Sequence, residues 1–383
     1  MKIKNLTAGH CYHRYCSSLK EKQLFRRLAL QPSVSVLDFS SNDYLGLSMN
    51  PQVITAAQHY ASEWGVGGRS SRVLMKEPSP HRILEEMIAQ TKNKDKALLF
   101  PAGFQANATV IAALLDKKVL GSDSLVFTDR LNHASLHHGC FCAQVQQLRY
   151  RHLDLDHLKN LLHKYRDDPR PKFLFTESLF GMDGDKVDMA RLVSIAREYD
   201  VFLYIDDAHA TGIFGERGYG LTEGFEEGID LIMGTFSKAL GASGGYVTGS
   251  APLIDYLTNR CGGFIYSTTL SPMIVGAVHQ AWTLLSTLDQ ERYRLLDLSE
   301  KVRYHLRALN YKTGRSESHI IPLIVGESER ALAMEESLKK KNILVSAIRP
   351  PTVSHGTARL RLTLTAKHTE EDIDTLFQAL EEL

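Results

Sequence analysis

Short apolar runs and longer amphipathic segments alternate along the middle of the chain. Six runs have the composition of buried strands, at residues 97–100, 125–128, 173–176, 202–205, 231–234 and 245–248. Between them, apolar residues recur at helical spacing over residues 104–115, 155–165 and 189–199. Strands that are apolar throughout are typical of sheets covered on both faces. The pattern therefore predicts an α/β domain with a mostly parallel sheet, in which ligands bind at the carboxyl ends of the strands.

The two ends of the chain follow other patterns. A helix is predicted at residues 15–30, ahead of an extended segment, and one long helix is predicted at residues 281–309. The remaining residues predict strands at 320–325, 343–347 and 359–363 and helices at 329–341 and 369–380. We therefore expect an amino-terminal segment (1–50), a large domain (51–285) and a small α+β carboxyl-terminal domain (286–383).

Composition narrows the classes of function. Of the 383 residues, 43% are hydrophobic and 23% are charged, and 45 Lys and Arg against 44 Asp and Glu give a formal charge of +1. This balance favours neither nucleic acid nor a membrane surface as a partner. Five cysteines without a CxxC pair argue against a disulfide framework or a zinc site, and no apolar run reaches 18 residues. A cytoplasmic protein is expected.

Lys238 lies among small and hydroxylated residues, downstream of Asp206, which ends the apolar run 202–205. A lysine in this position can form a Schiff base with pyridoxal 5'-phosphate (PLP), while the carboxylate keeps the pyridine nitrogen protonated. Taken alone, the lysine would suit a surface position after a helix cap. Asp206 and His209 favour the PLP site, because a metal site would need a second histidine at ligand spacing. Asp207 is expected to make structural hydrogen bonds.

Two further groups suit such a cofactor. Gly103 lies in a strand–helix turn whose N–H groups can hold a phosphate, and Thr235 and Ser237 add hydroxyl donors. By itself the turn would be an ordinary connection. His133 follows the strand 125–128 and could be a loop residue whose hydrogen bonds are satisfied within the loop. In a PLP site it could instead stack on the ring and serve in acid–base or oxyanion chemistry.

Two arginines alternate along a predicted strand near the carboxyl terminus. Arg359 and Arg361 share one face of this strand. A guanidinium directed into a pocket binds a carboxylate, and the alternative is a pair of solvated strand arginines. The polar segment 40–47, which contains Asn42, is typical of a turn with caps.

Taken together, these segments resemble the α-oxoamine synthases, which are PLP enzymes of the aspartate-aminotransferase fold that condense an amino acid with an acyl thioester. The similar stretches run in order along nearly the whole chain, at residues 39–47, 99–107, 132–135, 176–185, 205–212, 235–241, 264–269 and 348–365. The segments 322–326 and 347–363 are most similar to the biotin-pathway members. Those members join L-alanine to a pimeloyl thioester, carried on coenzyme A or on an acyl carrier protein.

The resemblance implies a role for each cofactor residue. Lys238 holds PLP and moves the Cα proton, and Asp206 pairs with the pyridinium nitrogen. His209 contacts the phenolic oxygen, and His133 stacks on the ring. The cofactor and its phosphate are also contacted by Gly103, Phe104 and Thr235.

The resemblance also implies substrate contacts and a shared site. Arg361 binds the amino-acid carboxylate with the help of Asn42, and Thr352 and Arg26 contact the substrate. The enzyme is expected to be a homodimer in which Thr268 reaches the phosphate of the neighbouring subunit.

The chain departs from the family pattern at two places. Gly181 stands where the family usually has a serine, which removes a hydroxyl near the phenolic oxygen. The glycine-rich run is altered at residues 67–72, and a glycine expected at residues 75–77 is missing. The rival interpretations are a glycine-using member of the family, an aminotransferase, which usually has an aromatic residue in place of His133, and a catalytically silent scaffold, which should lack Lys238.

Overall fold

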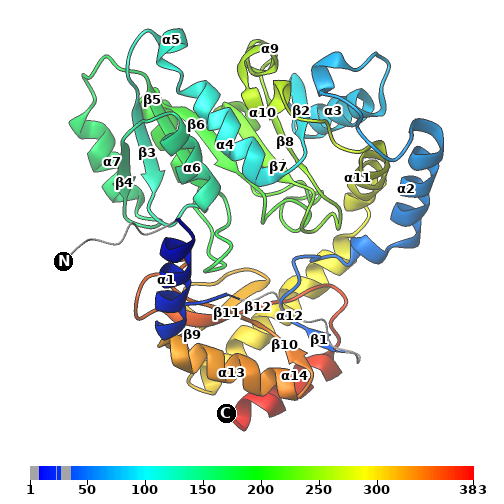
Figure 1. Ribbon diagram of the computed structural model, residues 1–383, viewed down its shortest axis with the longest axis vertical. Coiled ribbons are helices and arrows are strands. Elements are labelled where there is room, and N and C mark those ends of the chain that lie inside the picture. Colours follow the sequence, from blue (N-terminus) through cyan, green and yellow to red (C-terminus); the bar gives the residue numbers. More distant parts are fainter. Residues whose placement is uncertain (1–7, 23, 27–35) are drawn as a thin grey trace. The chain divides into compact units, whose positions relative to one another are not determined.

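The computed structural model describes residues 8–22, 24–26 and 36–383. The chain divides into two compact units, whose elements are labelled in Figure 1. The large unit contains residues 42–297 and 365–367, and the small unit contains the described residues up to 41 together with 298–364 and 368–383. None of the helices in the described part of the chain is long and apolar enough to cross a membrane.

The large unit is built on a seven-stranded sheet. Its strands, in spatial order, are β2 (Lys96–Phe100), β8 (Gly245–Gly249), β7 (Leu231–Thr235), β6 (Phe202–Asp206), β5 (Lys172–Glu177), β3 (Leu125–Asp129) and β4 (Gln147–Tyr150). Neighbours from β7 through β4 are parallel, whereas β8 is antiparallel to both β7 and β2. The sheet is mixed but mostly parallel, which confirms the predicted fold class. The sequence did not predict β4, because only Tyr150 in it is buried.

Helices cover both faces of this sheet, and α4, α6, α7, α9 and α10 can be followed in Figure 1. One face is covered by α4 (Gly103–Leu114), α6 (Ala134–Cys142), α9 (Ala251–Arg260) and α10 (Gly262–Ile265), and the other by α7 (Leu155–Lys164) and α8 (Met189–Glu198). Phe175 belongs to the first apolar cluster and its neighbour Leu174 to the second, because successive strand residues point to opposite faces. Burial on both faces explains the continuous apolar runs.

The other elements of the large unit are α2 (Pro51–Trp64), α3 (Pro80–Thr91), α5 (Lys117–Leu120), α11 (Pro272–Leu285) and the 3-10 helices η1 (Leu47–Met49), η2 (Arg72–Leu74) and η3 (Glu226–Gly228). The α2 and α3 helices begin at prolines that follow capping side chains. Asn50 accepts hydrogen bonds from the first turn of α2, and Ser79 accepts one from the first turn of α3. A proline at the first helical position, preceded by such a cap, fixes where each helix begins. The long helix α12 (Asp289–Ala308) starts in the large unit and ends in the small one.

The small unit contains a three-stranded antiparallel sheet. Its strands are β11 (Ser346–Ile348), β12 (Ala358–Thr363) and β9 (Ile320–Gly326), and β1 (Leu37–Asp38) pairs with β10 (Ile343–Leu344). Its helices are α1 (Ala8–Glu21), α13 (Ser328–Lys340) and α14 (Glu370–Glu381). Helix α14 begins with a capping box between Thr369 and Asp372.

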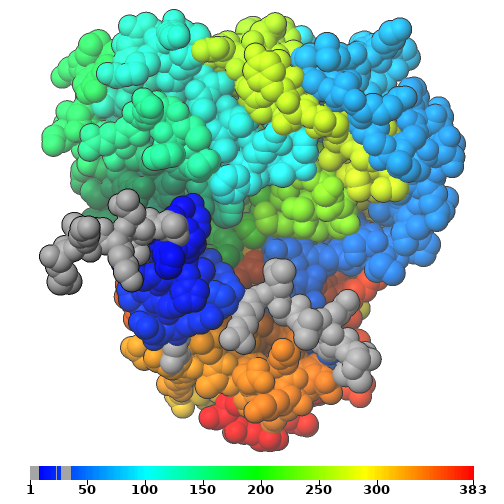
Figure 2. Space-filling model, viewed as in Figure 1, coloured from blue at the N-terminus to red at the C-terminus, as the bar shows by residue number. Residues whose placement is uncertain are grey.

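Helix α1 differs from the helix predicted at residues 15–30. It begins and ends earlier, and residues 23 and 27–30 of the predicted range lie outside the described residues. None of the residues in α1 is buried, and Figure 2 shows this dark-blue helix on the surface. The helix in this part of the chain is therefore a surface element.

The carboxyl ends of the parallel strands meet at one edge of the large sheet. Glu177 ends β5, Asp206 ends β6 and Thr235 ends β7. Glu177 and Asp206 are direct neighbours in the ladder. Because these strands run in the same direction, their chemistry-bearing ends lie side by side, as is general for α/β sheets.

Candidate active site

Eight residues predicted from the sequence line one cavity of about 180 Å³ in the large unit. They are Gly103, Phe104, His133, Asp206, His209, Thr235, Ser237 and Lys238. The cavity is also lined by three polar residues that the sequence did not single out, Asn107, Ser135 and Glu177. The site is therefore assembled from the starts of α4 and α6, from the carboxyl ends of β5, β6 and β7, and from the segments that follow β6 and β7.

Lys238 lies in a tight loop between β7 and β8. The Gly241 N–H donates to the Lys238 carbonyl at 2.8 Å, and the Phe236 N–H donates to the Gly244 carbonyl at 3.0 Å. Gly241 has a φ of 64°, and a Cβ there would lie 2.1 Å from the Ser48 nitrogen. Only glycine suits this close approach. The loop thus directs the Lys238 amine into the cavity.

Asp206 is buried and held by defined donors. Its Oδ2 accepts from the Asn107 amide at 2.7 Å, and its Oδ1 accepts from the Ala208 N–H at 3.0 Å. Asn107 is itself fixed, because its amide donates to Ser135 at 2.9 Å and its oxygen accepts from the Tyr204 hydroxyl at 2.6 Å. This network holds the carboxylate in one orientation at the end of β6.

A set of hydroxyl and N–H groups at one side of the cavity is suited to binding an anion such as a phosphate. The Thr235 hydroxyl donates to the Gly244 carbonyl at 2.8 Å and lies 2.9 Å from the Ser237 hydroxyl. Helix α4 begins beside them at Gly103, after Ala102, whose methyl side chain cannot cap the helix. A Cβ on Gly103 would lie 2.9 Å from Met233 Cε and 3.4 Å from Thr235 Oγ1. The uncapped helix start and the hydroxyls together suit an anion.

His133 is positioned by its backbone and by its ring. Its N–H donates to Glu177 Oε1 at 2.5 Å, and its Nδ1 lies 2.7 Å from the Ser135 hydroxyl. The pKa of His133 is lowered, because the effect of burial outweighs that of the Asp206 charge, which acts to raise it. Burial, together with the neighbouring Asp206, raises the pKa of Glu177 well above its ordinary value. The ring of His133 is therefore kept neutral at neutral pH.

His209 fills the space that a side chain at position 181 would occupy. A Cβ built on Gly181 would lie 2.2 Å from His209 Nε2. The other ring nitrogen, Nδ1, lies 2.7 Å from the Tyr44 hydroxyl, which also donates to Asn42 at 3.2 Å. The glycine therefore allows this position of the ring, and Tyr44 fixes it. Sequence reasoning missed Tyr44, although it lies in a segment that resembles the family.

Asp207 makes structural contacts behind the site. Its carboxylate accepts from Lys92 at 3.0 Å, from Ser178 at 2.6 Å and from Thr222 at 2.9 Å. The side chains of Lys92 and Asp207 are both buried. A Cβ on Gly220 would lie 1.8 Å from Asp207 Oδ2, so glycine is needed there. The expectation of structural hydrogen bonds is confirmed.

The predicted substrate residues of the small unit form two groups. Arg26 donates to the Thr352 hydroxyl at 3.0 Å, and both line a cavity of about 210 Å³ together with Arg349. Arg361 on β12 is buried, and it donates to Thr363 at 2.8 Å; Arg359 is buried as well. The alternative of two solvated strand arginines is therefore wrong.

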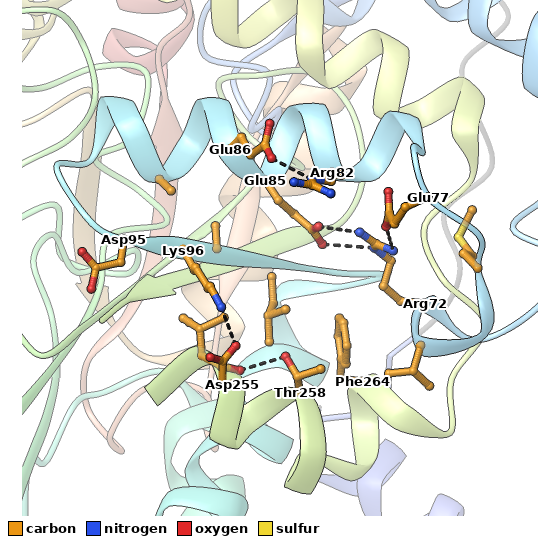
Figure 3. A pocket seen from close by; sticks show the side chains of 16 residues that line it. Arg72, Glu77, Arg82, Glu85, Glu86, Asp95, Lys96, Asp255, Thr258 and Phe264 are labelled. Carbon is orange, nitrogen blue, oxygen red and sulfur yellow. Dashed lines mark hydrogen bonds and ion pairs between the residues drawn. The ribbon is translucent and has the colours of Figure 1, made fainter. Parts of the chain in front are cut away.

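The altered loop at residues 67–72 is held against the segment that contains Thr268. The Thr269 N–H donates to the Ser70 carbonyl at 3.0 Å, and a Cβ on Gly68 would lie 2.3 Å from the Thr269 carbonyl oxygen. Arg72 anchors the end of the loop through ion pairs with Glu77 at 2.6 Å and Glu85 at 2.8 Å, drawn in Figure 3. Ion pairing thus supports the loop although the family's glycine at 75–77 is missing.

The residues of the 180 Å³ cavity fit PLP. They combine a lysine amine, a fixed carboxylate, two imidazoles and an anion-binding helix start within one small space. These are the groups that a Schiff base, a pyridinium nitrogen, a phenolic oxygen and a phosphate require. Gly103 keeps the helix start open, because a side chain there would contact Met233 and Thr235.

Comparisons with known proteins agree with this geometry. Residues 34–380 match the family described as aminotransferase class I and II. The chain is 45% identical to a putative 8-amino-7-oxononanoate synthase of Magnetococcus marinus, over 96% of both chains. It is 47% identical to an 8-amino-7-oxononanoate synthase of Gluconacetobacter diazotrophicus, over 91% of this chain and 88% of the relative. The solved structure of SPT with its PLP internal aldimine superposes with a TM-score of 0.89 at 25% identity, covering 97% of each chain.

The fold, the lysine–aspartate pair and the extent of these matches lead to one assignment. The chain belongs to the class I and II aminotransferase family of PLP-dependent fold type I enzymes, as an acyltransferase of the α-oxoamine synthase group that is similar to 8-amino-7-oxononanoate synthases.

Proposed function

We propose that the enzyme condenses L-alanine with a pimeloyl thioester, with loss of CO2, to give 8-amino-7-oxononanoate and the free thiol carrier. The observation that carries this proposal is the presence of His133 in the same cavity as Lys238 and Asp206. A histidine at this position supplies hydrogen-bonding chemistry that an aromatic residue would not. The names of the relatives at 45–47% identity support the choice of substrates.

In this mechanism the side chains of the cavity have defined tasks. PLP, when bound, supplies an electron-withdrawing ring that stabilises negative charge at the substrate Cα. Lys238 holds the cofactor and then takes the Cα proton, while Asp206 keeps the ring nitrogen protonated. His133 is neutral, and its Nδ1 contacts Ser135, so Nε2 serves the oxyanion that develops on the thioester carbonyl. His209, fixed by Tyr44, would contact the phenolic oxygen of the bound cofactor.

For the amino acid, we propose that Arg361 binds the alanine carboxylate, assisted by Asn42. A buried guanidinium on a strand is rigid and suited to bidentate carboxylate binding. The Arg361→Lys variant should raise the KM for alanine by about tenfold or more, since one lost charged hydrogen bond costs about 1.5–3 kcal/mol. An unchanged KM for alanine would remove Arg361 from this role.

For the acyl donor, we propose that the cavity lined by Arg26, Arg349 and Thr352 contacts the thioester. Two arginines at one cavity suit an anionic group, such as the distal carboxylate of the pimeloyl chain or a phosphate of the carrier. Saturation curves for Arg26→Gln with a pimeloyl and an uncharged acyl thioester on the same carrier distinguish these two contacts. If the variant loses affinity for the pimeloyl donor alone, Arg26 contacts the distal carboxylate of the pimeloyl chain.

We also propose a homodimer in which Thr268 serves the neighbouring active site. Thr268 is exposed, and large apolar side chains near it in sequence or in the cavity are also exposed, among them Phe104 and Tyr266. Exposed apolar side chains of this size are typical of interfaces. If Thr268 acts across the interface, each mixed dimer of a Lys238→Ala and a Thr268→Ala chain has one intact site of its two, so a 1:1 mixture that exchanges subunits freely should regain about a quarter of the wild-type sites. If the mixture is no more active than the two parent variants, Thr268 does not serve the neighbouring active site.

One experiment tests the proposed reaction against its rivals. The purified enzyme is given alanine or glycine with a panel of acyl thioesters, and the products are identified by mass. Alanine with the pimeloyl thioester should give 8-amino-7-oxononanoate. Preference for glycine would instead indicate a glycine C-acetyltransferase or a 5-aminolevulinate synthase. Alanine differs from glycine by one methyl group, and the discrimination that such a group allows is worth about 1–3 kcal/mol. A chain without any turnover would be a silent scaffold of the same fold.

A further inference from the structure

His152 lies between two buried carboxylates outside the cavity that contains Lys238. Its Nδ1 lies 3.0 Å from Asp129 Oδ1, and its Nε2 lies 3.0 Å from Asp185 Oδ2. The side-chain exposures are 9% for His152, 0% for Asp129 and 4% for Asp185. The ring also packs edge-on against Phe180, with 4.5 Å between the ring centres. All these residues belong to the large unit.

The geometry requires a charged ring. A carboxylate only accepts hydrogen bonds, so a ring that contacts one carboxylate at each nitrogen must carry a proton on both. Asp129 faces the ring from the end of β3, and Asp185 faces it from the loop after β5. In the turn of His152 itself, Arg151 and Asp154 pair with each other at 2.8 Å. Burial alone would lower the pKa of His152, but the hydrogen bonds to the two carboxylates outweigh it and raise the pKa to about 9.

Each of the two aspartates is held within a loop of the active site, Asp129 through its carboxylate and Asp185 through its backbone. Asp129 Oδ1 also accepts from the Leu131 N–H at 2.8 Å, two residues before His133, and its Oδ2 accepts from the Leu153 N–H at 2.8 Å. Asp185 closes the turn that contains Gly181, because its carbonyl accepts from the Phe180 N–H at 3.0 Å. His152 therefore joins the β3–α6 loop, which carries His133, to the β5–α8 loop, which lies against His209.

We propose that His152, as an imidazolium held by Asp129 and Asp185, is a positioning residue that fixes the loop of His133 against the loop of Gly181. It acts through these two loops and does not touch the substrate. The consequence for catalysis rests on the proposed function, since it concerns the role of His133. The charge state of the ring does not depend on that function.

The first test measures the charge state directly. In protein labelled with nitrogen-15 at histidine, the signals lost in His152→Gln identify His152. We expect both ring nitrogens to be protonated at pH 7.5 and the ring to lose one proton with a pKa of about 9. Asp185→Asn should lower this pKa by about one to three units, because it removes one opposite charge. A neutral ring at pH 7.5, or a pKa that does not move in Asp185→Asn, would overturn the proposal.

The second test separates positioning from general stability. Exchange of the alanine Cα proton with solvent reports on Lys238 without any thioester, whereas condensation also needs His133. We expect His152→Gln to lower kcat for condensation by about 10- to 100-fold, as displacement of a catalytic group by about 1 Å does. Proton exchange should fall much less. The control is His163→Gln, which replaces an exposed histidine of α7 and should leave both rates unchanged.

The outcomes can be told apart. Equal losses of exchange and condensation in His152→Gln would show a merely structural role and contradict the proposal. If His152→Gln does not fold, the same comparison is made with Asp185→Asn, which keeps the size of the side chain. If the wild-type enzyme exchanges the alanine proton but makes no condensation product, the proposed reaction fails while the titration of His152 still decides its charge.

Discussion

Lys238 is the side chain on which the chemistry depends. Its replacement by alanine removes both the attachment of PLP and the base for the Cα proton, so kcat should fall by at least about 10²- to 10⁴-fold. Borohydride reduction followed by peptide mass analysis should find the cofactor on the Lys238 peptide of the wild type and on no peptide of the variant. Lys96→Ala is the matched control, because Lys96 pairs with Asp255 at the surface. Cofactor bound covalently to the Lys238→Ala chain would contradict the assignment.

Gly181 and His209 compete for one volume. A methyl group at position 181 would lie 2.2 Å from the His209 ring, so Gly181→Ala should displace that ring from Tyr44. Forcing an extra carbon into a packed site costs about 1–3 kcal/mol, and we expect weaker binding of PLP as well as a lower unfolding midpoint. Gly262→Ala serves as the control, because the nearest atom to a Cβ there is 3.8 Å away. Equal cofactor affinity in the two variants would show that the position of His209 is unimportant.

The sequence predicted most of the residues with proposed chemical roles in the cavity, but it did not predict the residues that hold them in position. His133, Asp206, Thr235 and Lys238 each follow an apolar strand, and the carboxyl ends of parallel strands converge. Asn107 was missed because it meets Asp206 from 99 positions away, and a polar residue inside a helix gives no local signal. Glu177 ends a strand as Asp206 does, and that position could have identified it.

At the scale of elements, the pair of Lys92 and Asp207 connects the end of α3 to the end of β6. Both side chains are buried, and Lys92 also donates to the Tyr219 carbonyl and to Thr222 at 3.0 Å. Lys92→Met should lower the free energy of unfolding by about 3–5 kcal/mol, because it leaves a buried carboxylate without its cation. Denaturant titration measures the loss. The double variant Lys92→Met/Asp207→Asn should regain part of it, and a strictly additive loss would contradict the pairing.

Element types were easier to predict than element directions and ends. The six apolar runs became strands β2, β3, β5, β6, β7 and β8, because continuous burial leaves a strong signal. That β8 runs antiparallel between β7 and β2 depends on tertiary pairing, which apolar periodicity does not encode. The same limit applies to β12, where alternation placed Arg359 and Arg361 on one face but could not show that both are buried.

At the scale of the whole molecule, the buried His319 and the mostly buried His152 give the stability opposite pH dependences. Burial in the small unit lowers the pKa of His319 to about 3, helped by the charges of Arg361 and Arg303. Below about pH 6.5, His319 therefore binds a proton in the unfolded chain but stays neutral in the folded chain. Stability should fall by about 1 kcal/mol per pH unit between about pH 6 and pH 4, and His319→Gln should reduce this slope. His163→Gln is the control, and equal slopes in all three proteins would contradict the buried neutral ring.

The histidine of the large unit acts at the other end of the pH range. The pKa of His152 is raised to about 9, so its contribution is complete below about pH 6.5 and is lost as the pH rises through about 9. Unfolding midpoints measured from pH 6.5 to pH 9.5 should decrease in the wild type and less so in Asp185→Asn. An alkaline decrease of the same size in both proteins would assign it to another group.

The central claim is the condensation of alanine with a pimeloyl thioester, and the fate of the alanine carboxyl carbon tests it most directly. The enzyme is supplied with alanine carrying carbon-13 at that carbon and with the pimeloyl thioester, and CO2, free thiol and amino ketone are measured together. The account predicts equal amounts of labelled CO2, free thiol and unlabelled 8-amino-7-oxononanoate. Label retained in an amino-transfer product, or CO2 released without the thiol, would contradict it.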